Sequence, residues 1–174
     1  LRLKELFGPR KPVPLRALDQ LAFALGVIGR MLPLSRPDAI VVYTPPLPFA
    51  VLVGCYAWLR GIPLILNLHD LYPRTPIELG VLTNPLLIQG AFLLEKIAYR
   101  CATGFLVPSP GSRRYLIEAQ GIPSSRVTLI YNWVDTVGIR PGPKEAEFRR
   151  AHGGGGRFIV SDAGVMGYAQ DLSS

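Results

Sequence analysis

The segment "PLILNLHDLYPRTP", residues 63–76, passes from apolar to polar residues within a few positions. Its apolar run, which includes Leu64, Ile65 and Leu66, predicts a buried β-strand over 63–69. His69 and Asp70 come where this strand ends, and Pro73 predicts a turn after them. We therefore treat this strand end as a candidate site, because an imidazole there can exchange a proton or donate to a phosphate or a sugar hydroxyl.

Similar apolar runs recur along the chain and are separated by helical patterns. Strands are predicted over 38–44, 103–109 and 125–135, and helices over 15–32, 48–61, 84–102 and 110–121. Asn84 is a candidate N-cap with Pro85 at the first helical position. Strands that alternate with helices, and that are apolar throughout, predict an α/β fold: a Rossmann-like parallel sheet with helices on both faces.

The length, composition and net charge narrow the class of protein but do not identify its function. The chain has 174 residues, 49% of them hydrophobic, and a formal net charge of +7. This charge favours acidic partners such as phosphates or an anionic membrane surface. Nucleic acid is not expected as a partner, because the positive charges are scattered and no nucleic-acid-binding motif is present. Cys55 and Cys101 lack metal-ligand spacing, which favours two free thiols.

The most apolar segment, residues 39–59, is long enough to suggest a membrane span. Three prolines interrupt it near the middle: Pro45, Pro46 and Pro48. A strand, a turn and a buried helix therefore explain it better than a transmembrane helix does.

The last forty residues read differently from the rest of the chain. Residues 136–156 are rich in proline and glycine and predict a linker. Residues 157–174 then begin another strand, followed by a turn that contains Gly164 and Gly167. This glycine turn is a weak signal for anion binding, since it matches neither a dinucleotide-binding nor a P-loop pattern. We predict a first domain over 1–135, a linker over 136–156 and the start of a second, truncated domain over 157–174.

Five ordered segments resemble family 4 retaining glycosyltransferases, which have two Rossmann-like domains in the GT-B arrangement. They are "DAIVVYTPPLP" (38–48), "IPLILNLHDLYPRTPIELGVLTNPLL" (62–87), "LLEKIAYRCATGFLVPS" (93–109), "VTLIYNWVD" (127–135) and "FIVSDAGVMGYAQDL" (158–172). The closest-looking subgroup builds bacterial O-antigen and exopolysaccharide and includes fucosamine-type transferases. The resemblance covers nearly the whole chain.

The resemblance implies a nucleotide-sugar donor, expected to be UDP-linked, and a growing lipid-linked glycan as acceptor. It implies retention of the anomeric configuration and no metal or other cofactor. It gives catalytic roles to His69 and Asp70, donor binding to Gly164 and Gly167, and acceptor-side contacts to Tyr43 and Thr44. Asn132 and Asp135 match a segment that leads into the interdomain hinge. The implied location is cytoplasmic and peripheral on the inner membrane.

The chain also departs from the family pattern. Relatives commonly have Glu after the motif proline, where this chain has Arg74. The family's first strand is expected before residue 1 and its donor-binding E-x7-E region after residue 174, so the chain resembles a fragment truncated at both ends. Such a fragment is expected to be inactive by itself.

Two alternatives to the transferase remain open at this point. One is a nucleotide-sugar 2-epimerase of the same architecture, which needs no acceptor. The other is a non-catalytic half of a split glycosyltransferase. Asp70 likewise has two readings: it can orient an acceptor hydroxyl, or it can bond backbone N–H groups in an Asx-type turn.

Overall fold

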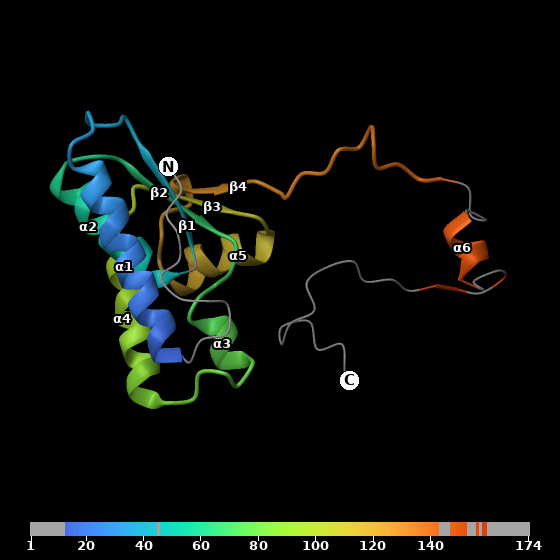
Figure 1. Cartoon of the computed structure of the whole chain (residues 1–174), viewed down its shortest axis with the longest axis horizontal. Coiled ribbons are helices and arrows are strands. Elements are labelled where there is room, and N and C mark those ends of the chain that lie inside the picture. Colours follow the sequence, from blue (N-terminus) through green and yellow to red (C-terminus); the bar gives the residue numbers. More distant parts are fainter. Residues whose placement is uncertain (1–12, 45, 143–146, 153–155, 157, 160–174) are drawn as a thin grey trace. The chain divides into compact units, whose positions relative to one another are not determined.

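The computed structural model describes residues 13–44, 46–142, 147–152, 156 and 158–159 (Figure 1). The chain divides between Tyr131 and Asn132 into two compact units, and each is described by itself. The predicted glycine turn with Gly164 and Gly167, and the start of the second domain over 160–174, lie outside the described residues.

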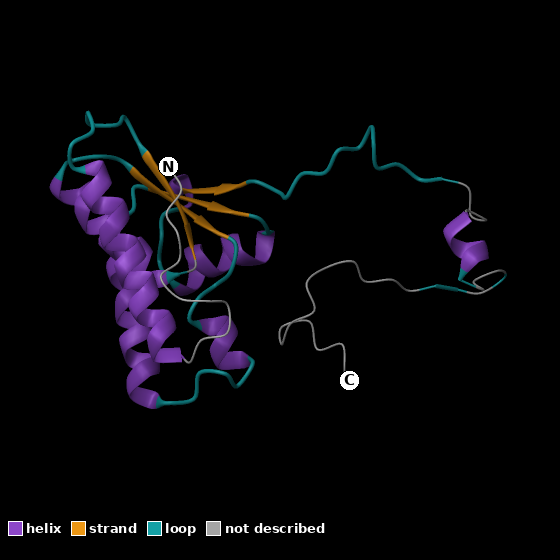
Figure 2. Ribbon diagram, in the orientation of Figure 1, coloured by secondary structure: helices purple, strands orange, loops and turns teal. Residues whose placement is uncertain are grey.

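The first unit contains a parallel sheet of four strands in the order β1-β2-β3-β4 (Figures 1 and 2). The strands are β1 (Ile40–Thr44), β2 (Leu64–Leu68), β3 (Gly104–Val107) and β4 (Val127–Leu129). The helices are α1 (Val13–Met31), α2 (Leu47–Leu59), α3 (Arg74–Glu78), α4 (Pro85–Cys101) and α5 (Pro110–Arg114). A π-helical turn η1 (Tyr115–Ala119) continues α5, and a 3₁₀ turn η2 (Ser124–Arg126) precedes β4. The predicted α/β, Rossmann-like parallel sheet is confirmed.

One face of the sheet carries the core. The register aligns Val42 with Leu66, Leu66 with Phe105, and Phe105 with Val127, and all four side chains are buried. Residues of α2, α4 and η1 belong to the same buried cluster, so these helices pack on this face. Figure 2 shows the long helices side by side next to the strands.

The opposite face of the sheet is open along β1 in the described part of the chain. Val41 and Tyr43 point to it and are 57% and 56% exposed. The strand order explains this asymmetry. Crossovers between parallel strands are right-handed in nearly all proteins, and every one here steps in the same direction, so the connecting helices fall on the same side. The sequence predicted helices on both faces because the strands are apolar throughout; the described helices cover one.

The helix boundaries follow the local signals in the sequence. The Asn84 side chain accepts hydrogen bonds from the N–H groups of Leu86 (2.9 Å) and Leu87 (3.3 Å), which confirms the predicted N-cap of α4. Gly61 follows the end of α2 with a φ of 61°, a left-handed conformation that glycine adopts without strain.

The apolar segment 39–59 forms β1 and α2, as predicted, with their boundary in its proline-rich middle. The α2 helix is covered by α4 and by α1, where the Phe23 and Phe49 rings lie 5.4 Å apart. Among the described residues, we find no helix that is both long enough and apolar enough to cross a bilayer.

Helices α2 and α4 approach closely at Gly54. A Cβ added to Gly54 would lie 3.0 Å from the Cβ of Cys101. Cys55 and Cys101 are both free thiols, as predicted, but the helix contact brings them together: burial, aided by the neighbouring Cys55 thiol, raises the pKa of Cys101. Nothing in their sequence spacing indicated this proximity.

We expect Gly54→Ala to lower the free energy of unfolding by about 1 kcal/mol, although alanine favours a helix, because the new methyl group meets a Cβ fixed to the backbone of α4. The matched control is Gly90→Ala on α4, where an added Cβ meets no described atom within 4 Å. That change is expected to stabilise the fold by up to about 1 kcal/mol. Urea titration of both variants tests the pair, and equal shifts in the same direction would contradict the close approach.

Candidate active site

The carboxyl ends of the four strands lie side by side at one edge of the sheet. Thr44 is level with Leu68, Asn67 is level with Leu106, and Val107 is level with Leu129. The segments that follow the strands therefore leave from the same edge. In open parallel sheets this edge is where ligands bind.

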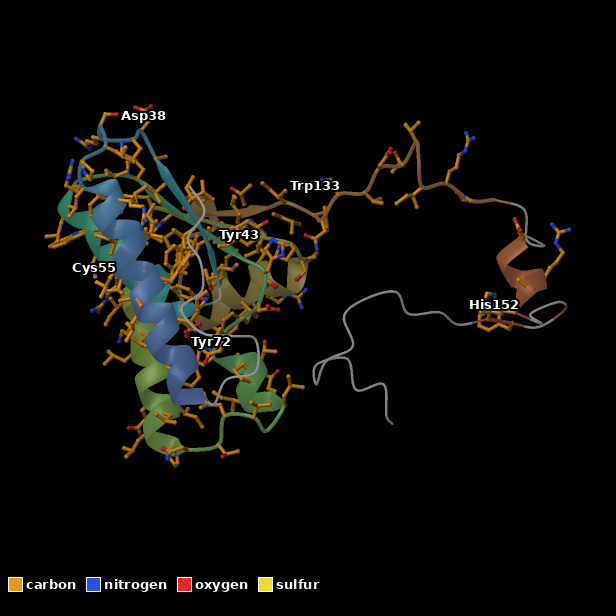
Figure 3. The ribbon with its side chains drawn as sticks, viewed as in Figure 1. Asp38, Tyr43, Cys55, Tyr72, Trp133 and His152 are labelled. Atoms are coloured by element: carbon orange, nitrogen blue, oxygen red, sulfur yellow. The ribbon has the colours of Figure 1, made fainter. Side chains whose placement is uncertain are left out.

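His69 and Tyr43 stack on each other at this edge. Their ring centroids lie 4.8 Å apart and their planes are inclined by 20°. Tyr43 projects from the open face of the sheet, whereas Cys55 lies in the helical layer (Figure 3). His69 follows β2 directly and its side chain is exposed, so the stack holds an imidazole at the surface in a defined orientation.

Thr44 does not share this position. It is 2% exposed and lies on the buried face of the sheet, next to β2. Successive residues of a strand point to opposite faces, so the strand that presents Tyr43 at the open face must turn Thr44 into the core. The structure therefore brings together Tyr43 and His69 among the predicted site residues, and not Thr44.

Asp70 is exposed beside this stack. The turn after it is closed by its backbone, since the Tyr72 N–H donates to the Asp70 carbonyl (3.1 Å). Among the described hydrogen bonds, none uses the Asp70 carboxylate, so the Asx-type turn does not account for this residue. The chain then passes through a cis Tyr72–Pro73 peptide bond and a buried Pro73 before it enters α3.

Asn132 and Asp135 belong to the second unit. The Asp135 carboxylate accepts hydrogen bonds from the N–H groups of Val137 (2.9 Å) and Gly138 (3.0 Å), and these lower the pKa of Asp135. Asp135 thus closes a local turn after the segment that contains Asn132. A short helix, α6 (Glu147–Ala151), follows later in this unit.

A second polar cluster, which the sequence did not indicate as a site, lies behind the loop that follows β2. Its centre is Glu95 of α4, which is 2% exposed and whose buried Oε1 atom has no hydrogen-bond partner among the described residues. Tyr99, one turn later on α4, and the Arg74 guanidinium both favour the charged form of this carboxyl group and so lower its pKa. Arg74 also lies 4.7 Å from the ring centroid of Tyr115.

Burial raises the pKa of Glu95, and the Tyr99 hydroxyl and Arg74 oppose this shift only in part. Burial and the neighbouring Glu95 also raise the pKa of Tyr99. A weak signal for this cluster was present in the sequence. Glu95 precedes Ala98, Tyr99 and Ala102 at the spacing of the buried face of a helix, where a carboxylate is out of place.

The comparisons with known proteins agree with this architecture. A family model described as a glycosyl transferase 4-like domain matches residues 2–133, more than half of the chain. The chain belongs to this family. A comparison with curated proteins found no match. The matched range ends close to the boundary of the first unit at Tyr131.

Membership of this family indicates which class of activity the first unit has. It is a glycosyltransferase domain with the α/β architecture of the N-terminal domain of a GT-B enzyme, and it serves a sugar donor and an acceptor. Within the described residues of this glycosyltransferase domain and of the second unit, no cluster of three or more His, Cys, Asp and Glu side chains is arranged to hold a metal ion.

Replacing Glu95 with glutamine tests the cost of the buried carboxylate. The pKa of Glu95 is higher in the folded state than the usual value of 4.5, so folding favours the protonated carboxyl group. The contribution of this group to the free energy of unfolding is therefore largest below pH 4.5 and is lost as the pH rises through the folded-state pKa. We expect E95Q to be as stable as the wild type in acid and more stable, by about 1–3 kcal/mol, once Glu95 ionises. Chemical denaturation from pH 4 to pH 9 measures this gap, and a constant gap would contradict the assignment.

Proposed function

We propose that this glycosyltransferase domain helps to transfer a sugar from a nucleotide-sugar donor, UDP-linked, to a growing lipid-linked polysaccharide, with retention of the anomeric configuration. Two findings support the proposal: the family match over residues 2–133, and the stack of His69 on Tyr43 at the ligand-binding edge of the sheet. The resemblance to fucosamine-type transferases of O-antigen and exopolysaccharide synthesis suggests an aminosugar donor. No observation favours the epimerase or the non-catalytic half over a transferase.

The stack of His69 on Tyr43 is the observation that carries the proposed mechanism. Tyr43 covers one face of the imidazole and limits its rotation, so that a ring N–H can point toward the bound donor sugar. A hydrogen-bond donor that is already oriented before the reaction stabilises the charge that develops in the transition state, because it need not reorient as the charge forms. Asp70, whose carboxylate makes no hydrogen bond within the described chain, is placed to accept one from a hydroxyl group of the acceptor.

The proposed reaction balances without a cofactor. The bond between the anomeric carbon of the donor and its phosphate oxygen breaks, and a bond from the same carbon to the acceptor oxygen forms on the same side of the ring. The departing diphosphate takes the acceptor's hydroxyl proton, while His69 stabilises charge near the reacting centre. Gly164 and Gly167 of a second domain are proposed to hold the diphosphate, with Asn132 and Asp135 in the segment that joins the domains.

We further propose that the intact enzyme works in the cytoplasm, on the surface of the inner membrane. A formal net charge of +7 supports attraction to anionic lipids, an effect worth about 1 kcal/mol for each basic residue near the surface. Exposed apolar side chains support contact with lipid. Leu86 and Leu87 in the first turn of α4 are 77% and 60% exposed, and they follow the segment that leaves the carboxyl edge of β2.

The first test of the proposed mechanism is His69→Ala in an enzyme that contains this domain together with a donor-binding domain. We expect kcat for sugar transfer to fall about 10²- to 10³-fold, since one fixed charge-stabilising donor is lost. Tyr43→Ala is expected to lower kcat about three- to tenfold, because the stack is lost. The control is Tyr43→Phe, which keeps the ring and should retain wild-type kcat. Undiminished transfer by the His69 variant would remove this residue from the mechanism.

The membrane proposal is tested by introducing charge where lipid contact is proposed. A double variant, L86E with L87E, should bind vesicles that contain anionic lipid at least tenfold more weakly, because each buried leucine contributes about 1.5–3 kcal/mol. Acidic residues in the first turn of a helix favour its dipole, so α4 should stay folded. Leu59→Glu, which changes an exposed leucine at the C-terminal end of α2, serves as control. Equal sedimentation of all three proteins with vesicles would refute the lipid-contact site.

A further inference from the structure

Arg74 links the candidate active site to the interior. It is the first residue of α3 and directly follows the loop 69–73 that carries His69 and Asp70. Its guanidinium lies over the ring of Tyr115, 4.7 Å from the centroid. Tyr115 begins η1, which continues the helix that leaves β3. The stack of Arg74 on Tyr115 therefore ties together the segments that leave two neighbouring strands.

The η1 segment is irregular at this contact. It is a π-helical turn over Tyr115–Ala119, in which the Gln120 N–H donates to the Tyr115 carbonyl (3.2 Å). The Gln120 side chain also donates to the Tyr115 hydroxyl. Turns of this kind are rare and occur frequently at functional sites. Here the turn fixes the ring that Arg74 covers.

Glu95 lies behind this stack. Its carboxyl group is buried, and within the described part of the chain one oxygen has no hydrogen-bond partner and Arg74 is the opposite charge that acts on it. Three further groups border the cluster: Tyr99 from α4, Tyr115 from η1, and Glu78 of α3, which acts on Tyr115. Glu95 and Glu78 are the two carboxyl groups among these residues.

We propose that Arg74 and Glu95 are positioning residues of the active site: the Glu95 carboxylate attracts Arg74, Arg74 stays over Tyr115, and the loop 69–73 is held for the chemistry of His69. This inference rests on the proposed function. It explains why the fold keeps a carboxyl group with an unsatisfied buried oxygen, an arrangement that costs stability. Residues kept at such a cost are characteristic of functional sites.

The direct test is amide hydrogen exchange of the full-length protein. Four amides report on the loop and on α3, because their hydrogen bonds close this segment: those of Tyr72, Thr75, Ile77 and Leu79. Arg74→Ala should raise their exchange rates about two- to fivefold, as expected for loss of an exposed cation–π contact. Arg74→Lys should restore part of the protection. The control is Arg114→Ala, which removes an exposed arginine next to Tyr115.

E95Q separates positioning from mere structural support. The variant should exchange faster than the wild type at these four amides even though the whole fold becomes more stable. The difference should be absent in acid and grow as the pH rises through the raised pKa of Glu95. Glu78→Gln should leave the pH dependence unchanged. In kinetic assays, E95Q and Arg74→Ala should lower kcat and leave the donor KM unchanged.

Each result bears on one of the two proposals. Faster exchange in both variants supports positioning, even if the wild-type enzyme transfers no sugar, in which case the proposed function fails by itself. Wild-type exchange in both variants overturns the positioning role, whether or not transfer is observed. Faster exchange in E95Q that is the same at every pH also overturns it, because the charge of Glu95 would then have no part.

Discussion

The right-handed crossover between parallel strands is the constraint on which this domain depends. Every connection steps in one direction across the sheet, so the described helices pack on a single face and build one core there. The same rule leaves Tyr43 on the open face, where it meets His69 at the carboxyl edge. The arrangement that buries the apolar surface also exposes the candidate site.

The two carboxylates near the loop 69–73, Asp70 and Glu95, differ in their exposure to water. At the sheet edge, the carboxylate of Asp70 stays in water, where its charge costs little and is available to a ligand. Glu95, in contrast, is buried, and one of its carboxyl oxygens has no hydrogen-bond partner among the described residues. A single loop separates the two, and Arg74 at its end takes part in the buried cluster. The loop 69–73 thus ends at a residue whose guanidinium lies over the Tyr115 ring.

Helix packing sets a second limit on this sequence. The contact of α2 with α4 requires a residue without a side chain at Gly54, and it brings two thiols from distant parts of the chain together. Small residues at a helix crossing let the backbones approach closely, which leaves little room for substitution. The helical layer that supports β1 and β2 is therefore sensitive at this one point.

The sequence alone determined the four strands, the helices α1, α2, α4 and α5, and their order, but not α3 or the π-helical turn. Apolar runs specify the strands, and local signals such as the cap at Asn84 and the glycine at Gly61 mark the helix boundaries, because these depend on neighbouring residues only. The sequence also singled out His69, since a strand end needs no tertiary contact to be recognised. Only the tertiary structure decided that Tyr43 faces this histidine while Thr44 is buried, that Cys55 meets Cys101, and that Glu95 lies near Arg74. These contacts depend on the handedness of the crossovers and on the packing of the helices. Both bring together residues that are far apart in the chain, so no periodic pattern in the sequence indicates them.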